Sequence, residues 1–220
     1  MAPIIEIFAV PPLGCNCTIV GDPETKEAVV VDPGGDVRQI LRKLEAAGLT
    51  LRKILITHGH LDHILGGREL KEATNAEIVM HADDLSLYEN VCAQCDDFGV
   101  DRPDAPLPRP DAFCSDGDVL MMAGQSIRCL HCPGHTPGST SYVFEEAKLC
   151  CPGDTLFAGS IGRTSWHGLP SLEGTSDSVQ IIGSIRQKLM ALPTETRVVS
   201  GHGPMTTIGD ERAHNPCIRM

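Results

Sequence analysis

The sequence has 220 residues, of which 41% are hydrophobic and 21% charged, as expected for a globular protein that can bury a substantial core. Its formal net charge of −11 argues against a nucleic-acid-binding protein, because such proteins usually present a basic face to the phosphate backbone. No uninterrupted run of about 18 apolar residues occurs, so the sequence predicts no membrane-spanning helix.

The amino-terminal segment and the ten cysteines indicate the compartment. Residues 1–6 contain no basic region followed by a long apolar run, so no secretory signal is predicted. The cysteine spacings do not resemble the disulfide framework of a small secreted domain. We therefore expect a reducing, cytoplasmic environment with mostly buried or incidental thiols. Cys92 and Cys95 leave open a redox pair or half of a structural four-cysteine zinc site.

Hydrophobic periodicity predicts strands and helices that do not alternate regularly. The elements expected in chain order are strands 4–10, 17–20 and 28–31, helix 36–47, strand 54–56, helix 66–74, strand 77–80, helix 83–100, strands 119–122, 126–130, 139–144 and 149–151, helix 176–192 and strand 197–200. Residues 101–111 contain four prolines and predict an irregular segment, either a substrate-facing lid or a connector. This order favours two layers of mixed β-sheet covered by helices over a doubly wound parallel sheet.

Four potential metal ligands lie within six residues shortly after the predicted strand 54–56. If extended backbone continues to His60, the side chains of His58 and His60 project to the same side, because strand side chains repeat every two residues. Asp62 keeps this parity and His63 does not, which suggests two adjacent metal ions. Imidazole and carboxylate together suit zinc, iron or manganese. The alternative, a polar loop with surface histidines, is disfavoured by this density of donors.

Three later segments have the same character, each with a strand, then glycine or proline, and a histidine or aspartate. Taken singly, each of these donors could belong to an ordinary polar turn. Together with the first stretch they complete a set of seven: His58, His60, Asp62, His63, His135, Asp154 and His202.

With these residues the chain resembles the metallo-β-lactamase superfamily, and within it a compact subgroup of the glyoxalase II (hydroxyacylglutathione hydrolase) branch. The segments that carry the resemblance are 57–63, 31–35, 133–139, 153–157, 159–164, 200–207 and 211–216. The resemblance implies an α/β (α+β) fold, an αββα sandwich of two mixed β-sheets flanked by helices, as a single domain over residues 1–220. It places the site at one edge of the sheets.

The resemblance also implies the ligand assignment. One metal ion would be held by His58, His60 and His135, the second by Asp62, His63 and His202, and Asp154 would bridge them. Two divalent ions, with zinc favoured over iron or manganese, would hold a water and lower its pKa towards about 7. The resulting hydroxide would attack a thioester carbonyl, and a thiolate leaves with little need for protonation. Asp62 and Asp154 would be the catalytic carboxylates, with Asp62 also orienting the water.

The predicted activity is a metal-dependent thioesterase that hydrolyses S-lactoylglutathione or a related acyl thioester. We expect a small-molecule substrate, no nucleic acid or membrane partner, and no sequence indication of oligomeric state. Arg163 is the candidate for binding an anionic substrate group, with a structural ion pair as the alternative. The chain departs from the family in two ways that concern the thiol part of the substrate. No helical domain that would help bind glutathione is expected after His202, and Ser165 stands where many relatives have aspartate.

Two other functions remain as alternatives. The first is a persulfide dioxygenase with a single iron held by His58, His135 and Asp154, because two histidines and one carboxylate support oxygen chemistry. The retained donors for a second metal ion favour hydrolysis over this reaction. The second is a non-catalytic metal-binding protein, which the complete ligand set disfavours. The remaining histidines are predicted to be structural or surface groups: His81, His131, His167 and His214.

Overall fold

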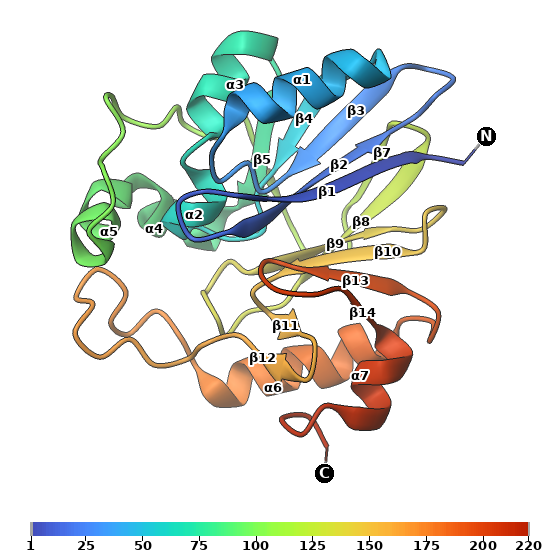
Figure 1. Cartoon of the computed structure of the whole chain (residues 1–220). Helices are drawn as coiled ribbons and strands as arrows, with labels where there is room; N and C mark the ends of the chain where they lie inside the picture. Colours follow the sequence, from blue (N-terminus) through green and yellow to red (C-terminus); the bar gives the residue numbers. More distant parts are fainter. Residues whose placement is uncertain (1, 220) are drawn as a thin grey trace.

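The computed structural model describes residues 2–219, which form two six-stranded sheets packed face to face with helices on both outer sides (Figure 1). Helices α1 and α3 cover the first sheet, and α6 and α7 cover the second. The predicted α/β fold of two mixed sheets flanked by helices is therefore confirmed. None of the helices within the described residues is long and apolar enough to cross a membrane.

The first sheet has the strand order β1–β2–β3–β4–β5–β6. Its strands are β1 (Ile4–Val10), β2 (Cys15–Gly21), β3 (Glu27–Val31), β4 (Thr50–Leu55), β5 (Glu77–His81) and β6 (Ala112–Cys114). β1 to β3 pair antiparallel, whereas β3 to β6 pair parallel. Parallel neighbours need a crossover, and helices α1 (Val37–Ala47) and α3 (Gly67–Thr74) occupy the first two crossovers.

The second sheet has the order β14–β13–β10–β9–β8–β7. Its strands are β7 (Val119–Met122), β8 (Gln125–His131), β9 (Thr140–Phe144), β10 (Leu149–Gly153), β13 (Arg197–Ser200) and β14 (Thr206–Thr207). All neighbours pair antiparallel except β10 and β13, which are parallel. The crossover between these two contains the small hairpin of β11 (Leu156–Phe157) and β12 (Ser160–Ile161), then α6 (Ser178–Gln187) and the 3₁₀ turn η2 (Leu189–Ala191). Helix α7 (Ile208–His214) follows β14.

Strand periodicity explains how the apolar side chains form layers. Val29 and Val31 of β3 belong to the cluster between the two sheets, whereas Val30 belongs to the cluster beneath α1 and α3. Leu55 and Ile54 of β4 divide in the same way. Successive side chains of a strand point to opposite faces, so a strand buried on both faces is apolar throughout.

Two predicted helices are wrong in extent. The region 83–100 is divided into the 3₁₀ turn η1 (Ala82–Asp84), α4 (Leu85–Glu89) and α5 (Val91–Phe98). Asn90, with φ −90° and ψ 20°, separates α4 from α5, because its side chain favours non-helical backbone. The observed helix α6 is shorter than the predicted helix 176–192. It begins after its N-cap Asp177 and ends before Lys188, whose φ is −111°.

The elements missing from the prediction are all short: β6, β11, β12, β14, α7 and the one-turn helix α2 (Leu61–Ile64). Segments of two to seven residues are too short for a clear hydrophobic period, and tertiary contacts form them. The segment 101–111 contains no helix or strand, as predicted.

Candidate metal centre

The seven predicted donors all follow the carboxyl ends of strands. Strands β8 and β10 both run antiparallel to β9, and β13 runs parallel to β10, so these three point the same way. The loops after them carry His135, Asp154 and His202 to one edge of the second sheet. The loop after β4 brings the remaining four donors to the same place, as the distances below show.

The condition for strand parity, a continuous extended backbone from the strand to His60, is not met. Strand β4 ends at Leu55, and Leu61–Ile64 form the single turn α2, for which His60 is the N-cap. The backbone N–H and the hydroxyl of Thr57 donate to the carboxylate of Asp32, at 2.8 and 2.7 Å, and fix the chain as it leaves the strand. The donors therefore converge through a loop and a helical turn, rather than through strand parity.

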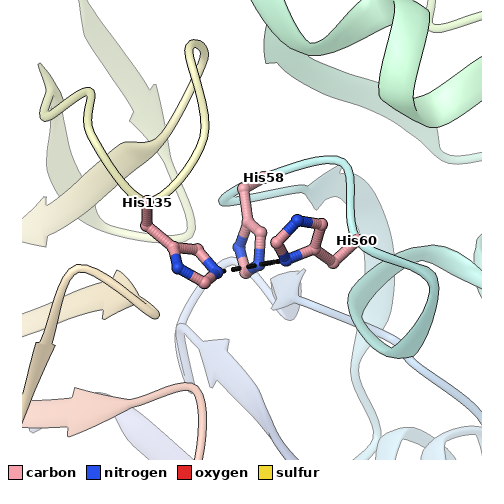
Figure 2. Close-up of side chains that lie close together, drawn as sticks. All are labelled: His58, His60 and His135. Carbon is pink, nitrogen blue, oxygen red and sulfur yellow. Dashed lines mark hydrogen bonds between the residues drawn. The ribbon is translucent and has the colours of Figure 1, made fainter. Parts of the chain in front are cut away.

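The first group of candidate metal ligands consists of three histidines whose ring nitrogens face one another: His58, His60 and His135 (Figure 2). His60 Nδ1 lies 3.1 Å from His58 Nε2 and 3.1 Å from His135 Nε2. Two ligands of one tetrahedral zinc ion, each about 2.0–2.1 Å from the metal, lie roughly 3.3 Å apart. The group thus has the spacing that a single ion requires.

The second group contains two histidines and two carboxylates. His202 Nε2 lies 3.0 Å from Asp62 Oδ2, and His63 Nε2 lies 3.7 Å from the same oxygen. Asp154 reaches both groups, because its oxygens lie 3.5 Å from His63 Nε2, 3.8 Å from His202 Nε2 and 3.6 Å from His135 Nε2. The structure therefore brings together all seven residues that the sequence singled out.

Buried polar atoms left without a partner support metal binding. Within residues 2–219, His63 Nε2 and Asp154 Oδ1 are buried and make no hydrogen bond. Such atoms are rare in folded proteins unless a ligand, water or ion satisfies them. The backbone is also tailored to this site, since a Cβ atom on Gly201 would lie 2.1 Å from Asp154 Oδ1. The donor set therefore fits a pair of divalent ions.

The first group is neutral, as metal binding requires. Burial, reinforced by the neighbouring imidazoles, lowers the pKa of His58 and of His60 well below the usual value, and burial also lowers the pKa of His135. Burial would raise the pKa of the Asp154 carboxyl, but the rings of His63, His135 and His202 together outweigh this effect and lower the pKa. Neutral rings and ionised carboxylates are the forms that bind cations.

Three of the rings are held through the nitrogen that faces away from the cluster. His135 Nδ1 donates to the carbonyl oxygen of Arg163 at 2.8 Å, and His63 Nδ1 lies 2.9 Å from the Asp32 carboxylate. His58 Nδ1 lies 3.0 Å from the Thr57 hydroxyl. Such partners fix the tautomer and the orientation of a metal-binding histidine. Asp32 received no role from the sequence, although its position directly after β3, the parallel neighbour of β4, could have indicated one.

A cavity of about 430 Å³ lies against the cluster. Its apolar lining includes Phe98, Phe157 and Trp166, and Arg163 also contributes to it. The Arg163 guanidinium lies 5.4 Å from the Trp166 ring and makes no ion pair with any residue that the structure describes. Arg163 is thus available to a ligand, and the alternative of a structural ion pair is not supported. Trp166, which also packs against His60 with ring centroids 5.0 Å apart, received no role from the sequence.

The other open alternatives concern residues away from this centre. The segment 101–111 does not line the cavity, so the structure favours a connector over a lid. All ten cysteines are free, and no cluster of four thiols occurs in the described part of the chain. His81 and His131 stack on one another, with centroids 3.9 Å apart, and His167 does not line the cavity.

Residues 10–202 match the sequence profile of the metallo-β-lactamase superfamily. The chain belongs to this superfamily. It is 38% identical over 213 residues to hydroxyacylglutathione hydrolase GloC of Haemophilus influenzae, covering 96% of each chain. Among solved structures, BLEG-1 B3 metallo-β-lactamase aligns with a TM-score of 0.85 at 32% identity, covering 98% of this chain and 99% of the other. TTHA1623 in a di-iron-bound form aligns with a TM-score of 0.81 at 34% identity and the same coverage. The glyoxalase II-like resemblance is thereby confirmed.

Proposed function

We propose that this member of the superfamily is a two-metal hydrolase that cleaves a small acyl thioester, S-lactoylglutathione or a relative of it. The observation that carries the proposal is the position of Asp154, whose two oxygens lie within 3.8 Å of histidines from both ligand groups. A carboxylate between two complete groups is suited to bridging two ions. The 38% identity to a hydroxyacylglutathione hydrolase supports a thioester as the substrate class.

The proposed ligands are those expected from the sequence. His58, His60 and His135 would hold one ion, Asp62, His63 and His202 the other, and Asp154 would join them. When bound, the two ions would lower the pKa of water towards about 7 and polarise the substrate carbonyl. We favour zinc, and the di-iron form of TTHA1623 supports iron as an alternative.

The remaining steps belong to the protein's own side chains. The Asp62 carboxylate, whose Oδ2 lies 3.0 Å from His202 Nε2, would also orient the attacking water by accepting its hydrogen bond. The apolar wall of Phe98, Phe157 and Trp166 would receive uncharged parts of the substrate and exclude bulk water from the carbonyl. Arg163 would bind an anionic group of the thiol or acyl portion, since within the described residues it lies over the Trp166 ring at the cavity and forms no ion pair. The thiolate can leave without a dedicated general acid.

The proposed setting follows from the same observations. Ten free cysteines support a reducing, cytoplasmic compartment. We propose a single catalytic domain over residues 1–220 that acts on a small molecule, without nucleic acid or membrane.

The experiment is metal analysis of the purified protein together with turnover of three substrate classes. We expect two ions per chain and release of thiol from S-lactoylglutathione. The second substrate class is β-lactams, which are included because the chain is 32% identical to BLEG-1 B3 metallo-β-lactamase. The third class is glutathione persulfide, assayed by oxygen consumption. Binding of a single iron with oxygen uptake, or β-lactam hydrolysis without thioesterase activity, would overturn the proposal.

A further inference from the structure

The backbone between β4 and α2 is held by side chains from outside the metal centre. Because residues 57–60 lie in neither a helix nor a strand, their buried N–H and C=O groups need other partners. The Gly59 N–H donates to Asp84 Oδ2 at 2.8 Å. Gln94 Nε2 donates to the Gly59 carbonyl at 2.9 Å, and Gln94 Oε1 accepts from the Leu61 N–H at 3.0 Å. The region of η1 to α5 thus fixes the loop that carries His58 and His60.

The same carboxylate also holds the loop after β8. Asp84 Oδ2 accepts from the Thr136 hydroxyl at 2.7 Å, and Asp84 Oδ1 accepts from the Gly138 N–H at 2.5 Å. Asp84 therefore links two ligand loops from opposite sheets through three hydrogen bonds. Buried polar atoms with this many partners restrict the geometry around them.

The hydrogen-bond partners of Asp84 lie next to the ligands of only one of the two groups. Gly59 lies between His58 and His60 in the sequence, and Thr136 directly follows His135. These are the three histidines of the first group. No hydrogen-bond partner of Asp84 is adjacent in sequence to Asp62, His63 or His202.

The burial of Asp84 and the close packing around it support a structural role for these hydrogen bonds. Asp84 is fully buried, and within residues 2–219 it forms no ion pair with lysine or arginine. A Cβ atom on Gly59 would lie 3.0 Å from the Asp84 carbonyl oxygen, and one on Gly138 would lie 2.6 Å from the Asp84 nitrogen. Glycine at both positions allows the loops to approach η1 this closely. A carboxylate whose oxygens accept every bond fits these three donors, whereas an amide would turn an N–H towards one of them.

We propose that Asp84 is a positioning residue for the three-histidine half of the centre, setting the affinity for one of the two metal ions without touching metal or substrate. This inference rests on the proposed metal centre. The three ligands of this ion come from two loops, so a shift of either loop would move their nitrogens apart. Removing the shared carboxylate should therefore weaken the first site and leave the second site intact.

The test compares Asp84→Asn with Asp104→Asn, a control that makes the same change at an exposed aspartate outside the ligand loops. Each protein is stripped of metal and titrated with Co²⁺ in competition with a chelator, and the absorption bands report each site. His135→Ala and His202→Ala supply reference spectra for proteins with only one complete site. For Asp84→Asn we expect one site to weaken by about 10-fold or more, on the order of losses at outer-shell partners of metal ligands. The weakened site should be the one missing in His135→Ala.

Thermal unfolding of the metal-free proteins separates positioning from folding. If Asp84→Asn does not fold, Thr136→Val decides, because it is nearly isosteric and removes one of the three hydrogen bonds to Asp84, together with the contact between the Thr136 and Ser139 hydroxyls. Equal weakening of both sites, or no change at either site, contradicts the inference while leaving the thioesterase proposal intact. Failure of the native protein to bind two ions removes the basis of both, so the two failures can be distinguished.

Discussion

The carboxylate of Asp32 lies 2.9 Å from Nδ1 of His63 and accepts two further hydrogen bonds from Thr57. It therefore connects the end of β3 to a proposed ligand of the second ion. Asp32 has a positive φ of 52°, a backbone conformation that few non-glycine residues adopt. This backbone conformation occurs at the residue whose carboxylate bonds both Thr57 and His63.

Replacing Asp32 with alanine should affect both stability and metal binding. The buried N–H of Thr57 would lose its partner, which costs about 1–3 kcal/mol in the free energy of unfolding. The affinity of the second site should fall by about 10- to 100-fold, because the His63 ring loses its orienting contact. Urea unfolding of the metal-free protein and chelator competition measure the two effects. Asp22→Ala, which changes an aspartate in the turn between β2 and β3, should leave metal affinity unchanged.

The ligand assignment predicts different losses at two positions. Asp154→Asn should weaken both ions and reduce thioesterase activity by at least about 1,000-fold, because Asp154 contacts histidines of both groups. His202→Ala should remove one ion and leave the other. Metal content per chain after dialysis, measured beside turnover, distinguishes these results. His214→Ala changes an exposed histidine remote from the cluster and is the control. Loss of the same single ion in both ligand variants would contradict the bridging role.

The type of donor and its position after a strand were sufficient to identify the seven converging residues. Their spacing could not show how they converge, because strand parity fails after Leu55 and the turn depends on Asp32, which is distant in sequence. The roles of Asp84 and Gln94 could not be predicted from the sequence either. Both lie in a region predicted as one continuous helix, and a helical pattern does not reveal that a buried carboxylate or amide satisfies another loop. Tertiary hydrogen bonds, rather than local propensity, decide these features.

Arg163 should control the affinity for charged substrates. Arg163→Gln removes the cation at the cavity, so KM for a thioester that carries a carboxylate should rise by about 10-fold, with little change in kcat. Arg163→Lys keeps the charge and should recover part of the affinity. Steady-state kinetics with a charged and an uncharged thioester provide the internal control, because KM for the uncharged substrate should not change. An equal effect on both substrates would show that Arg163 acts through the shape of the cavity.

Metal removal should destabilise the protein as well as inactivate it. A ligand that binds only the folded state stabilises it by about 4 kcal/mol at 1,000 times its dissociation constant. Stripping the ions with a chelator should therefore lower the unfolding temperature and abolish thioester hydrolysis, and adding Zn²⁺ should restore both. Calorimetry and activity measured on the same sample check this expectation. Full activity in metal-free protein would contradict the mechanism.

The ion pair between Lys71 and Asp111 predicts a pH dependence that is independent of the metal centre. Lys71 Nζ lies 2.6 and 2.8 Å from the Asp111 oxygens, and the Ile78 N–H donates to Asp111 at 2.8 Å. Partial burial alone would raise the pKa of Asp111, but these partners outweigh it and lower the pKa. Because the pKa in the folded state is below that of the unfolded chain, about 3.9, the unfolded state binds the proton first as the pH falls. The stabilisation is therefore complete well above pH 4 and is lost as the pH falls through the lower, folded-state pKa.

Asp111→Asn tests this sign. At pH 7 the substitution should cost about 1 kcal/mol in the free energy of unfolding, because the pair is partly exposed and only its charge is removed. At pH 3 the difference from the native protein should shrink, since protonation begins to remove the same charge there. Urea unfolding of the metal-free proteins at both pH values separates this effect from acid release of metal. Asp101→Asn, at an exposed aspartate in the irregular segment, is the control and should show no difference at either pH. A cost that stays constant or grows at pH 3 would mean that the charge of Asp111 is not what stabilises the fold there.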